Sequence, residues 1–365
     1  MSSEIASEND LVAEALAAAG KDEELRTAII DALRAAEDRA ENPALFREQV
    51  RWPLILSLLS EVKTHRVVLE NGVIFDVSAA SRIEKALLLS STAHPDHVWE
   101  PQTTRLLVTL AAGAANVIVG GAYIGDHVVL IARAMIDAKR GGVVHAFEPM
   151  KASFERLLHH VEINGLDNVV AHQIGLWDKS DVQLRLEGHL GLASSLPAND
   201  SDDSVDERIQ SVSIDDYARS KELAAVELIM LDTEGGEENA LRGARETIAQ
   251  HSPNIIFEIH RNFVDWSNGL EQTSIATLLT SQGYDVFAIR DFHNNYPMSG
   301  YPLEIIPISK VYLAGPPHGF NVLATKDPDL VNRLDLRIVE NVSPKLLLEK
   351  DPALHAPLST RSPEF

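Results

Sequence analysis

Residues 116–149 read NVIVGGAYIGDHVVLIARAMIDAKRGGVVHAFEP, and this stretch decides the fold. An apolar run at 117–119 leads into a glycine-rich turn, an amphipathic segment, a Gly-Gly break, a second apolar run and then Glu148. Strand, tight turn, helix, strand and acid in this order indicate a nucleotide-binding βαβ unit. Gly121 and Gly125 would let the backbone approach a ligand closely, and the N-terminus of the helix would offer free N–H groups. An acid after the second strand can accept hydrogen bonds from ribose hydroxyls.

The glycine pattern also allows a plainer interpretation. Gly121 and Gly125 are four residues apart, so the pattern G-x-G-x-x-G is not matched, and glycines can serve a tight turn alone. Glu148 favours binding, because it directly follows a strand-like run, a little past the spacing expected for a ribose acid.

Composition excludes several classes of protein. The chain has 365 residues, of which 45% are apolar and 24% charged, enough for one large core or two domains. The formal net charge of −22 repels phosphate backbones, so we expect no nucleic-acid partner. The chain has no cysteine, which excludes disulfides, thiolate metal sites and a cysteine nucleophile. The N-terminus has no secretory signal pattern, and no run of about 18 apolar residues occurs. We therefore expect a soluble, cytoplasmic protein that does not bind membranes.

Apolar spacing divides the chain into four expected segments. Residues 1–65 show helical periodicity without a convergent polar cluster, so we expect accessory helices that form a homodimer or cover the site. Residues 66–112 contain an Asn-Gly hairpin and a helix that leads into the core. Residues 113–326 alternate strands and helices, which predicts a doubly wound, mostly parallel α/β sheet of seven strands with an antiparallel hairpin at its edge. Residues 327–365 form a tail with little expected chemistry.

Shorter stretches allow further predictions. Residues 81–89 are expected to form a helix with Glu84 exposed, and residues 237–249 a single helix. His94 and His97 are interpreted as loop residues because no third ligand lies nearby in the sequence, so we expect no metal site. The segment 291–319 is rich in Pro, Gly, Asn and aromatic residues and is predicted to be a lid, whereas the acidic residues 199–206 are predicted to be a loop.

Six motifs follow one another along the chain: Trp99-Glu-Pro101, Gly121-Ala-Tyr-Ile-Gly125, Phe147-Glu-Pro149, Ser213-Ile-Asp-Asp216, Leu231-Asp-Thr-Glu-Gly235 with Leu241-Arg-Gly-Ala244, and Phe257-Glu-Ile-His260. In this order they resemble the FkbM family of S-adenosylmethionine-dependent class I methyltransferases. Each motif is weak alone, but six in the same order are fairly specific. The resemblance covers roughly residues 95–326 and implies a Rossmann-like sheet.

The resemblance implies an S-adenosylmethionine site at the carboxyl ends of strands 1, 2 and 4. Two positions depart from the family pattern, because Val119 replaces an acid and Tyr123 replaces an Asn. Glu100 or Asp126 would then supply the polar group at the methionine end of the cofactor. The implied contacts are the methionine end for Gly121, Tyr123 and Gly125, the ribose for Glu148, the adenine for Leu176 and Trp177, and the methionine amine or the acceptor for Asp232.

Methyl transfer sets simple chemical requirements. It is an in-line displacement from a sulfonium to an oxygen or nitrogen, so alignment of the reactants carries much of the acceleration. A base for an alcohol proton adds a further factor. Asp232, Glu234, Glu258 and His260 follow or end strands, and we assign the catalytic role to Asp232, Glu234 and His260. Two alternatives stay open: Glu234 could be a helix N-terminal carboxylate, and His260 could bond to a loop.

The favoured function is an S-adenosylmethionine-dependent O-methyltransferase of secondary metabolism. Its small-molecule acceptor would be a sugar or a polyketide-type metabolite, a class that the resemblance supplies. One alternative is a nicotinamide-dependent oxidoreductase, which the irregular glycine turn, the antiparallel end and the lack of a Tyr-x-x-x-Lys arrangement disfavour. The other is a non-catalytic relative that kept the fold, suggested by Val119 and Tyr123.

Overall fold

The computed structural model describes residues 8–90, 94–187, 194–197, 208–313 and 319–358. The chain divides into two compact units, Met1–Trp99 with Asn294–Tyr296, and Glu100–His293 with Pro297–Phe365. This division differs from the four expected segments. The hairpin groups with the N-terminal helices, and the C-terminal tail groups with the sheet. Within the described ranges, no helix combines the length and apolarity needed to cross a bilayer.

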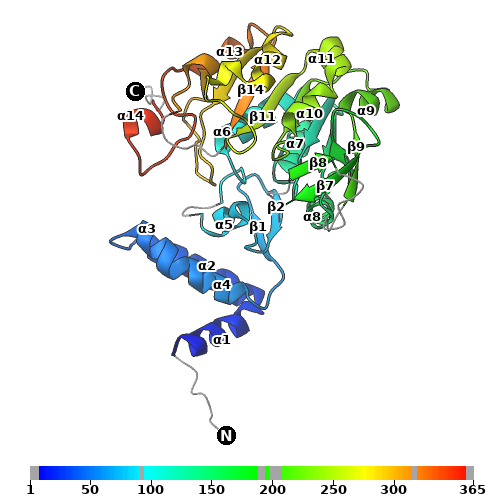
Figure 1. The fold of residues 1–365 in the computed structure, drawn as a ribbon. Helices are drawn as coiled ribbons and strands as arrows, with labels where there is room; N and C mark the ends of the chain where they lie inside the picture. Colours follow the sequence, from blue (N-terminus) through cyan, green and yellow to red (C-terminus); the bar gives the residue numbers. More distant parts are fainter. Residues whose placement is uncertain (1–7, 91–93, 188–193, 198–207, 314–318, 359–365) are drawn as a thin grey trace. The chain divides into compact units, whose positions relative to one another are not determined.

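The N-terminal unit consists of short helices and a hairpin, coloured blue to cyan in Figure 1. Gly20 ends the first helix, and a Cβ there would overlap the Leu58 carbonyl, so the absence of a side chain lets two helices touch. A π-helical turn, Arg47–Arg51, joins the third helix to the fourth. The elements are α1 (Glu8–Gly20), α2 (Glu23–Glu37), α3 (Pro43–Phe46), α4 (Trp52–Leu59), β1 (His65–Val68), β2 (Ile74–Val77) and α5 (Arg82–Leu88).

Buried charges hold this unit together. The Arg51 guanidinium donates to Glu37 Oε2 at 2.7 Å and to the Leu88 carbonyl at 3.0 Å, so it satisfies a carbonyl at the end of α5. Neither side chain of the Arg51–Glu37 pair is more than 1% exposed. The prediction of an exposed Glu84 was wrong. Its carboxylate is buried because it accepts hydrogen bonds from the backbone N–H and the hydroxyl of Ser78.

The second unit is built on a nine-stranded sheet with the order β15-β13-β12-β14-β11-β10-β3-β4-β5. The five strands from β11 to β5 are parallel, and β14 runs antiparallel to both β11 and β12. The bounds are β3 (Asn116–Gly120), β4 (Val143–Phe147), β5 (Val169–His172), β10 (Leu228–Leu231), β11 (Asn254–His260), β12 (Asp285–Ile289), β13 (Glu304–Pro307), β14 (Gly319–Thr325) and β15 (Arg337–Ile338).

The doubly wound, mostly parallel α/β sheet is confirmed, but the count of seven strands was too low. β13 lies in the segment that was predicted to be a lid, and β15 has two residues. These strands extend the sheet beyond β12, so the reversed pair β12–β14 does not form its edge. Residues 314–318 lie outside the described part of that segment, and its role as a lid stays a prediction.

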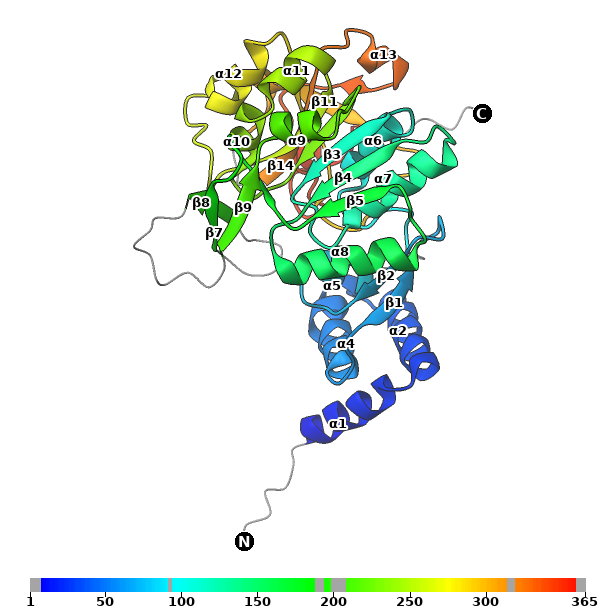
Figure 2. The same ribbon diagram turned by 90° about the vertical axis from the view of Figure 1, so that its right-hand side faces the viewer.

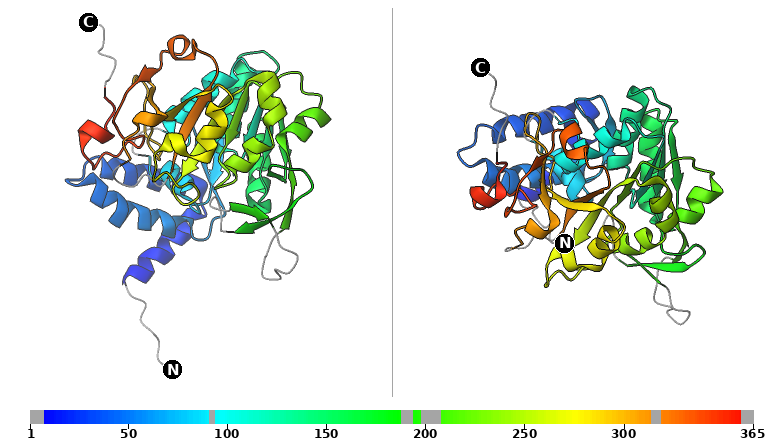
Figure 3. Two further views of the ribbon diagram at one scale, coloured as in Figure 1. Left: turned by 45° about the horizontal axis from the view of Figure 1, so that its top comes forward. Right: turned by 90° about the horizontal axis from the view of Figure 1, so that it is seen from above.

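Helices cover both faces of the sheet, as Figures 2 and 3 show. The expected single helix 237–249 is two helices that meet at Gly243. A Cβ at Gly243 would overlap the Trp177 carbonyl, and the Gly243 carbonyl accepts the Asp215 N–H at 2.8 Å. One face carries α6 (Pro101–Ala111), α7 (Asp126–Asp137) and α8 (Lys151–Ile163), and the other carries α9 (Ile214–Ser220), α10 (Glu237–Arg242), α11 (Arg245–His251) and α12 (Ser274–Thr280).

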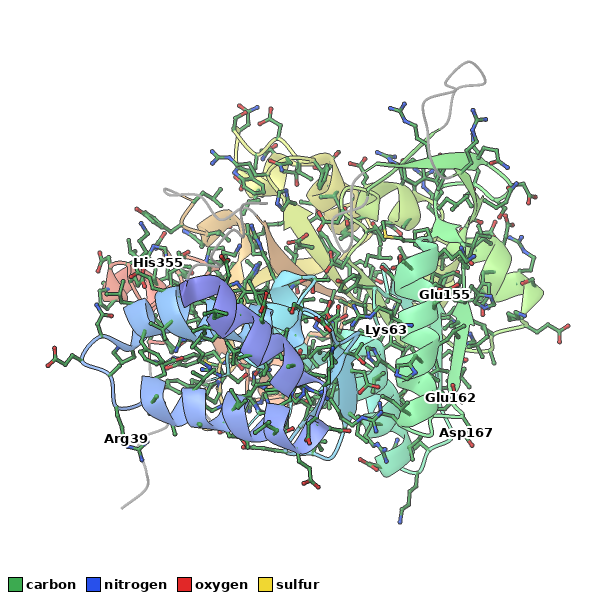
Figure 4. All side chains as sticks on the ribbon, turned by 90° about the horizontal axis from the view of Figure 1, so that it is seen from below. Arg39, Lys63, Glu155, Glu162, Asp167 and His355 are labelled. Atoms are coloured by element: carbon green, nitrogen blue, oxygen red, sulfur yellow. The ribbon has the colours of Figure 1, made fainter. Side chains whose placement is uncertain are left out.

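Helix α8 shows how periodicity produces the two-sided helix that such a layer needs. Leu157 and His160 are buried, whereas Glu155 and Glu162 are exposed along the outer side of the helix (Figure 4). Apolar groups at helical spacing therefore face the sheet, and charged groups face water.

A small second sheet is inserted after β5. Its order is β6-β9-β7-β8, and its Leu184 and Ile209 pack with Trp177 in a separate small core. The predicted inserted strand at 182–186 corresponds to β7, whereas the predicted loop 199–206 lies outside the described residues. The bounds are β6 (Gly175–Leu176), β7 (Gln183–Glu187), β8 (Ser194–Pro197) and β9 (Arg208–Val212).

A buried chain of hydrogen bonds ties β3, β4 and β5 to α9. The Asn116 side-chain N–H donates a hydrogen bond to the Ala225 carbonyl, which orients the amide. Its oxygen therefore accepts a hydrogen bond from His145 Nε2 at 3.0 Å. His145 Nδ1 then accepts a hydrogen bond from the Tyr217 hydroxyl at 2.8 Å, and the hydroxyl oxygen accepts a hydrogen bond from His172 Nε2 at 2.8 Å. Burial lowers the pKa of His145 to about 4 and raises the pKa of Tyr217 to about 12. The chain therefore stays neutral at physiological pH.

Candidate functional site

Parallel register places four residues in one row at the carboxyl edge of the sheet. Gly120 pairs with Phe147 on β4 and with Leu231 on β10, and Leu231 pairs with Phe257 on β11. The residues that follow these four are Gly121, Glu148, Asp232 and Glu258, and these following residues are called the row below. Ligands of open α/β sheets bind beyond this edge, so the row is the candidate active site.

The glycine turn is tight on both sides. Gly121 has φ +73°, and a Cβ there would overlap the Asp232 carbonyl oxygen, so the turn touches the end of β10. Gly125 has φ +87°, and its Cβ would lie 2.7 Å from the Leu157 side chain. Between them Tyr123 also has a positive φ, +45°, which a non-glycine residue rarely adopts. Crowding by backbone thus requires glycine at 121, and the positive φ favours glycine at both positions, so the turn brings backbone rather than side chains to the edge.

Glu148 links this turn to the start of α8. Its carboxylate is buried and accepts the Tyr123 N–H at 2.8 Å and the Met150 N–H at 2.9 Å. A carboxylate has about four acceptor positions, so these two bonds and hydrogen bonds to a ligand can share one group. The residue predicted to hold the ribose therefore also fixes the shape of the glycine turn.

Three carboxylates converge at the ends of β10 and β11. One oxygen each of Asp232, Glu234 and Glu258 can be chosen so that all three lie within 4.8 Å of one another. Burial, and next the charge of Glu237, raise the pKa of Glu234 to about 7. Burial, and next Glu234 and Glu237, raise the pKa of Glu258 to about 8. The pKa of Asp232 is raised well above its ordinary value, first by burial and then by Glu258.

Glu237, rather than Glu234, is the acid at the start of α10. Its carboxylate accepts the Thr233 N–H at 2.7 Å and the Gly235 N–H at 3.0 Å. Glu234 precedes the helix and has φ +51°, so it belongs to the loop. The alternative that Glu234 is a helix N-terminal carboxylate is therefore wrong, because Glu237 occupies that position.

His260 ends β11 two residues after Glu258, on the same side of the strand. Its Nδ1 accepts the Asn262 N–H at 3.1 Å, so the neutral ring carries its proton on Nε2. The ring also packs against Phe263 with a centroid distance of 5.4 Å. The hydrogen bond from His260 to a loop, which was one of the two open alternatives, is therefore present. Because this bond uses Nδ1, the Nε2 atom points away from the loop.

Glu100 comes to the same edge from the start of α6. It is buried, has φ +48°, and accepts the Asn321 side-chain N–H at 2.5 Å. Burial, and next Asp291 and Glu258, raise its pKa well above the ordinary value. Asp291 holds the start of α6, because its carboxylate accepts the Thr103 N–H at 2.7 Å. Asn321 and Asp291 were not predicted as site residues.

Leu176 and Trp177 diverge from each other. A Cβ at Gly120 would lie 2.7 Å from the Leu176 side chain, so Leu176 is buried beside the end of β3. Trp177 packs in the core of the inserted sheet, and its ring also reaches Gly236 at the start of α10. Leu176 therefore lies beside the end of β3, whereas Trp177 joins the start of α10 to the insertion.

Strand order and register define the class of this protein. A doubly wound sheet with the order β5-β4-β3-β10-β11-β14-β12, in which β14 is reversed, is the fold of class I methyltransferases. Residues 120–286 match the family model described as the methyltransferase FkbM domain. The resemblance inferred from the six motifs is confirmed over that range.

Solved structures show distant similarity. The methyltransferase FkbM from Methylobacillus flagellatus KT is 17% identical with a TM-score of 0.34; the match covers 67% of this chain and 53% of that one, about half its length. An O-methyltransferase from Bacillus cereus in complex with SAH is 14% identical with a TM-score of 0.35, over 67% and 90% of the two chains. TYW2 from M. jannaschii, in complex with AdoMet, is 11% identical with a TM-score of 0.33, over 72% and 84%. No curated protein matches the chain.

Proposed function

We propose that this protein is an S-adenosylmethionine-dependent methyltransferase that methylates a hydroxyl of a small molecule such as a sugar or a polyketide-type metabolite. The observation that carries the proposal is the row of Gly121, Glu148, Asp232 and Glu258 at the carboxyl edge of a sheet with the class I strand order. The family match over residues 120–286 supports the methyltransferase class.

The donor groups of the row fit the cofactor. S-adenosylmethionine carries two ribose hydroxyls, an ammonium and a sulfonium. Glu148 offers a carboxylate one residue after β4, the position of the ribose acid in dinucleotide-binding folds. Glu100 would face the positive methionine end, and Asp232 would lie between the methionine amine and the acceptor, where a positive ligand would favour the ionised forms of both groups. Gly121 presents backbone at the edge, where a side chain would have no room.

The acceptor would lie beyond Asp232, where Glu234 and His260 come from the loops after β10 and β11. Acceleration comes mainly from holding the hydroxyl in line with the transferred methyl group. In this proposal Asp232 and Glu234 orient the hydroxyl through hydrogen bonds, and His260 Nε2 donates a further one. The hydroxyl proton would pass to the carboxylate of Asp232 or Glu234, and such proton removal adds typically about 10²–10⁴-fold.

Isothermal titration with S-adenosylmethionine, S-adenosylhomocysteine and NAD separates the candidate functions. We expect the two sulfur nucleosides to bind and NAD not to bind, and methyl release on a panel of hydroxylated small molecules. NAD binding alone would indicate an oxidoreductase, and cofactor binding without turnover on any acceptor would favour a non-catalytic relative.

Single substitutions test the catalytic assignment. Asp232→Asn and His260→Ala should lower the single-turnover rate at saturating cofactor, because both are placed at the acceptor. Glu271→Gln, a change of an exposed acid that is not assigned to the site, is the control and should turn over like the parent. If both site variants also match the parent, the acceptor binds elsewhere.

A further inference from the structure

The acidic cluster at the ends of β10 and β11 has an arrangement that methyl transfer from a sulfonium does not require. One oxygen each of Asp232, Glu234 and Glu258 can meet around a common point, all within 4.8 Å of one another. Oxygen ligands on opposite sides of a bound Ca²⁺ are up to about 5 Å apart, and those around Mg²⁺ about 4 Å apart. The three oxygens therefore lie within the span of a Ca²⁺ coordination shell, and a smaller ion such as Mg²⁺ would draw them slightly closer together.

A second observation, independent of the acids, points to the same place. Asn321 on β14 pairs with Glu258 in the antiparallel register, so the two side chains lie on the same face of the sheet. Asn321 is 3% exposed; its N–H group donates to Glu100, and its side-chain oxygen has no hydrogen-bond partner among the residues that the structure describes. Buried polar atoms are almost always satisfied, so this amide oxygen, beside the carboxylates, points to a missing ligand.

The shape of the sheet also makes room for this arrangement. Gly319 pairs with His260 at the start of β14, and a Cβ there would overlap Glu258 Oε1. The Glu258 carboxylate can thus occupy its place over the strand only because residue 319 is a glycine. Lys345 lowers the pKa of Glu258, but burial and the charges of Glu234 and Glu237 outweigh it and raise that pKa.

From this geometry we propose that Asp232, Glu234 and Glu258, with the Asn321 amide oxygen, bind one hard divalent cation of the Mg²⁺, Mn²⁺ or Ca²⁺ class. Carboxylate and amide oxygens without histidine or cysteine suit this class of ion. The sequence suggested no metal, because the four donors come from three strand ends that only the sheet brings together. The inference rests on the proposed function for its purpose: a divalent cation beside the acceptor lowers the pKa of a hydroxyl bound to it.

Manganese is a suitable probe because its electron paramagnetic resonance signal reports free ion directly. Titrated into the full chain, Mn²⁺ should bind with one site per chain, and Mg²⁺ or Ca²⁺ should displace it. Glu258→Gln and Asp232→Asn should weaken Mn²⁺ binding by about tenfold or more, because ligand charge sets affinity in such sites. Glu271→Gln should bind like the parent, which excludes a general effect of the acidic surface.

A glycine pair tests the geometry with every ligand retained. Gly319→Ala should weaken Mn²⁺ binding, because the new methyl group displaces the Glu258 carboxylate. Gly113→Ala is the matched control, since its nearest neighbour is an Arg140 side-chain nitrogen 3.8 Å from the new Cβ. Thermal unfolding in EDTA shows whether each variant is folded. Equal Mn²⁺ binding by the parent and both glycine variants, or no binding by the folded parent, would overturn the site.

The cation site and the methyltransferase assignment can each be refuted independently of the other. Binding of S-adenosylhomocysteine is measured in EDTA, where the cation plays no part. If the nucleoside binds and the parent holds no Mn²⁺, the cation site is refuted and the proposed function stands. If Mn²⁺ binds at this site and no sulfur nucleoside does, the proposed function fails and the cation site stands.

Discussion

Substitution of Glu148 should have two separable effects, because its carboxylate fixes the glycine turn and is also assigned to the cofactor ribose. The carboxylate accepts the backbone N–H groups of Tyr123 and Met150 at 2.8 and 2.9 Å. A hydrogen bond to a charged group contributes about 1.5–3 kcal/mol, and a buried N–H left unsatisfied costs about 1–3 kcal/mol. Glu148→Ala orphans both N–H groups, so we expect the free energy of unfolding to fall by about 2–6 kcal/mol.

Glu148→Gln separates the two effects. Glutamine keeps one carbonyl oxygen for one of the two N–H groups, so its loss of stability should be about half that of alanine. The ribose assignment predicts that both variants bind S-adenosylhomocysteine more weakly, by roughly one to three orders of magnitude for alanine, at about 1.4 kcal/mol per tenfold. Glu155→Gln, on the exposed side of α8, is the control and should change neither quantity.

Urea unfolding and isothermal titration measure the two effects on the same samples. Normal nucleoside binding by folded Glu148→Gln and Glu148→Ala would refute the ribose assignment and with it the nucleotide role of the βαβ unit. An unchanged unfolding midpoint for Glu148→Ala would refute the account of the turn. A loss of binding that follows the loss of stability across both variants would show that Glu148 acts through the turn alone.

Three further predictions concern other parts of the molecule. The pKa of His145 is about 4 in the folded protein and about 6.5 in the unfolded chain, so the free energy of unfolding should fall by up to about 3 kcal/mol as the pH drops from 6.5 to 4. Urea unfolding at several pH values in this range should show a weaker dependence of that free energy on pH for His145→Gln than for the parent. Gly121→Ala should weaken nucleoside binding in calorimetry more than Gly141→Ala, because both have φ near +72° but only the first lacks space. Arg51→Met should destabilise the N-terminal unit by about 2–6 kcal/mol in urea, since it removes the donor to buried Glu37 Oε2 and to the Leu88 carbonyl while Arg47 still pairs with Glu37 Oε1; a midpoint like the parent's would contradict this.

The parallel core was predictable because its strands can be recognised from their own residues and from the residues beside them. The run 117–119 is apolar and is followed by glycine, and the run 143–147 is apolar except at His145 and follows a glycine pair, so composition and turn residues both indicate strands. β13 and β15 were missed because their pairing joins residues 304–305 to 337–338, across a segment rich in breakers. Such a long-range ladder leaves little trace in either short sequence.

The site was predictable where function follows the end of a strand. Glu148 and Asp232 come directly after apolar runs, and parallel register then aligns them. Asn321 was missed because it lies near the start of a strand, and only the reversal of β14 brings that start to the carboxyl edge. The roles of Glu234 and Glu237 could not be separated in the sequence, because the backbone turn at Glu234 decides which carboxylate reaches the loop N–H groups.

The register of the row has a consequence for how this fold diversifies. Gly121, Glu148 and Asp232 are held one residue beyond ladder positions, so backbone hydrogen bonds set their places and loop shapes do not. Insertions after the row, such as the small sheet β6–β9, can lengthen or change without shifting the row. A deletion of one residue within β10 would instead turn its alternate side chains to the opposite face. We expect relatives with different acceptors to differ in the length of these loops. The part of the edge that is assigned to the cofactor should stay the same among them.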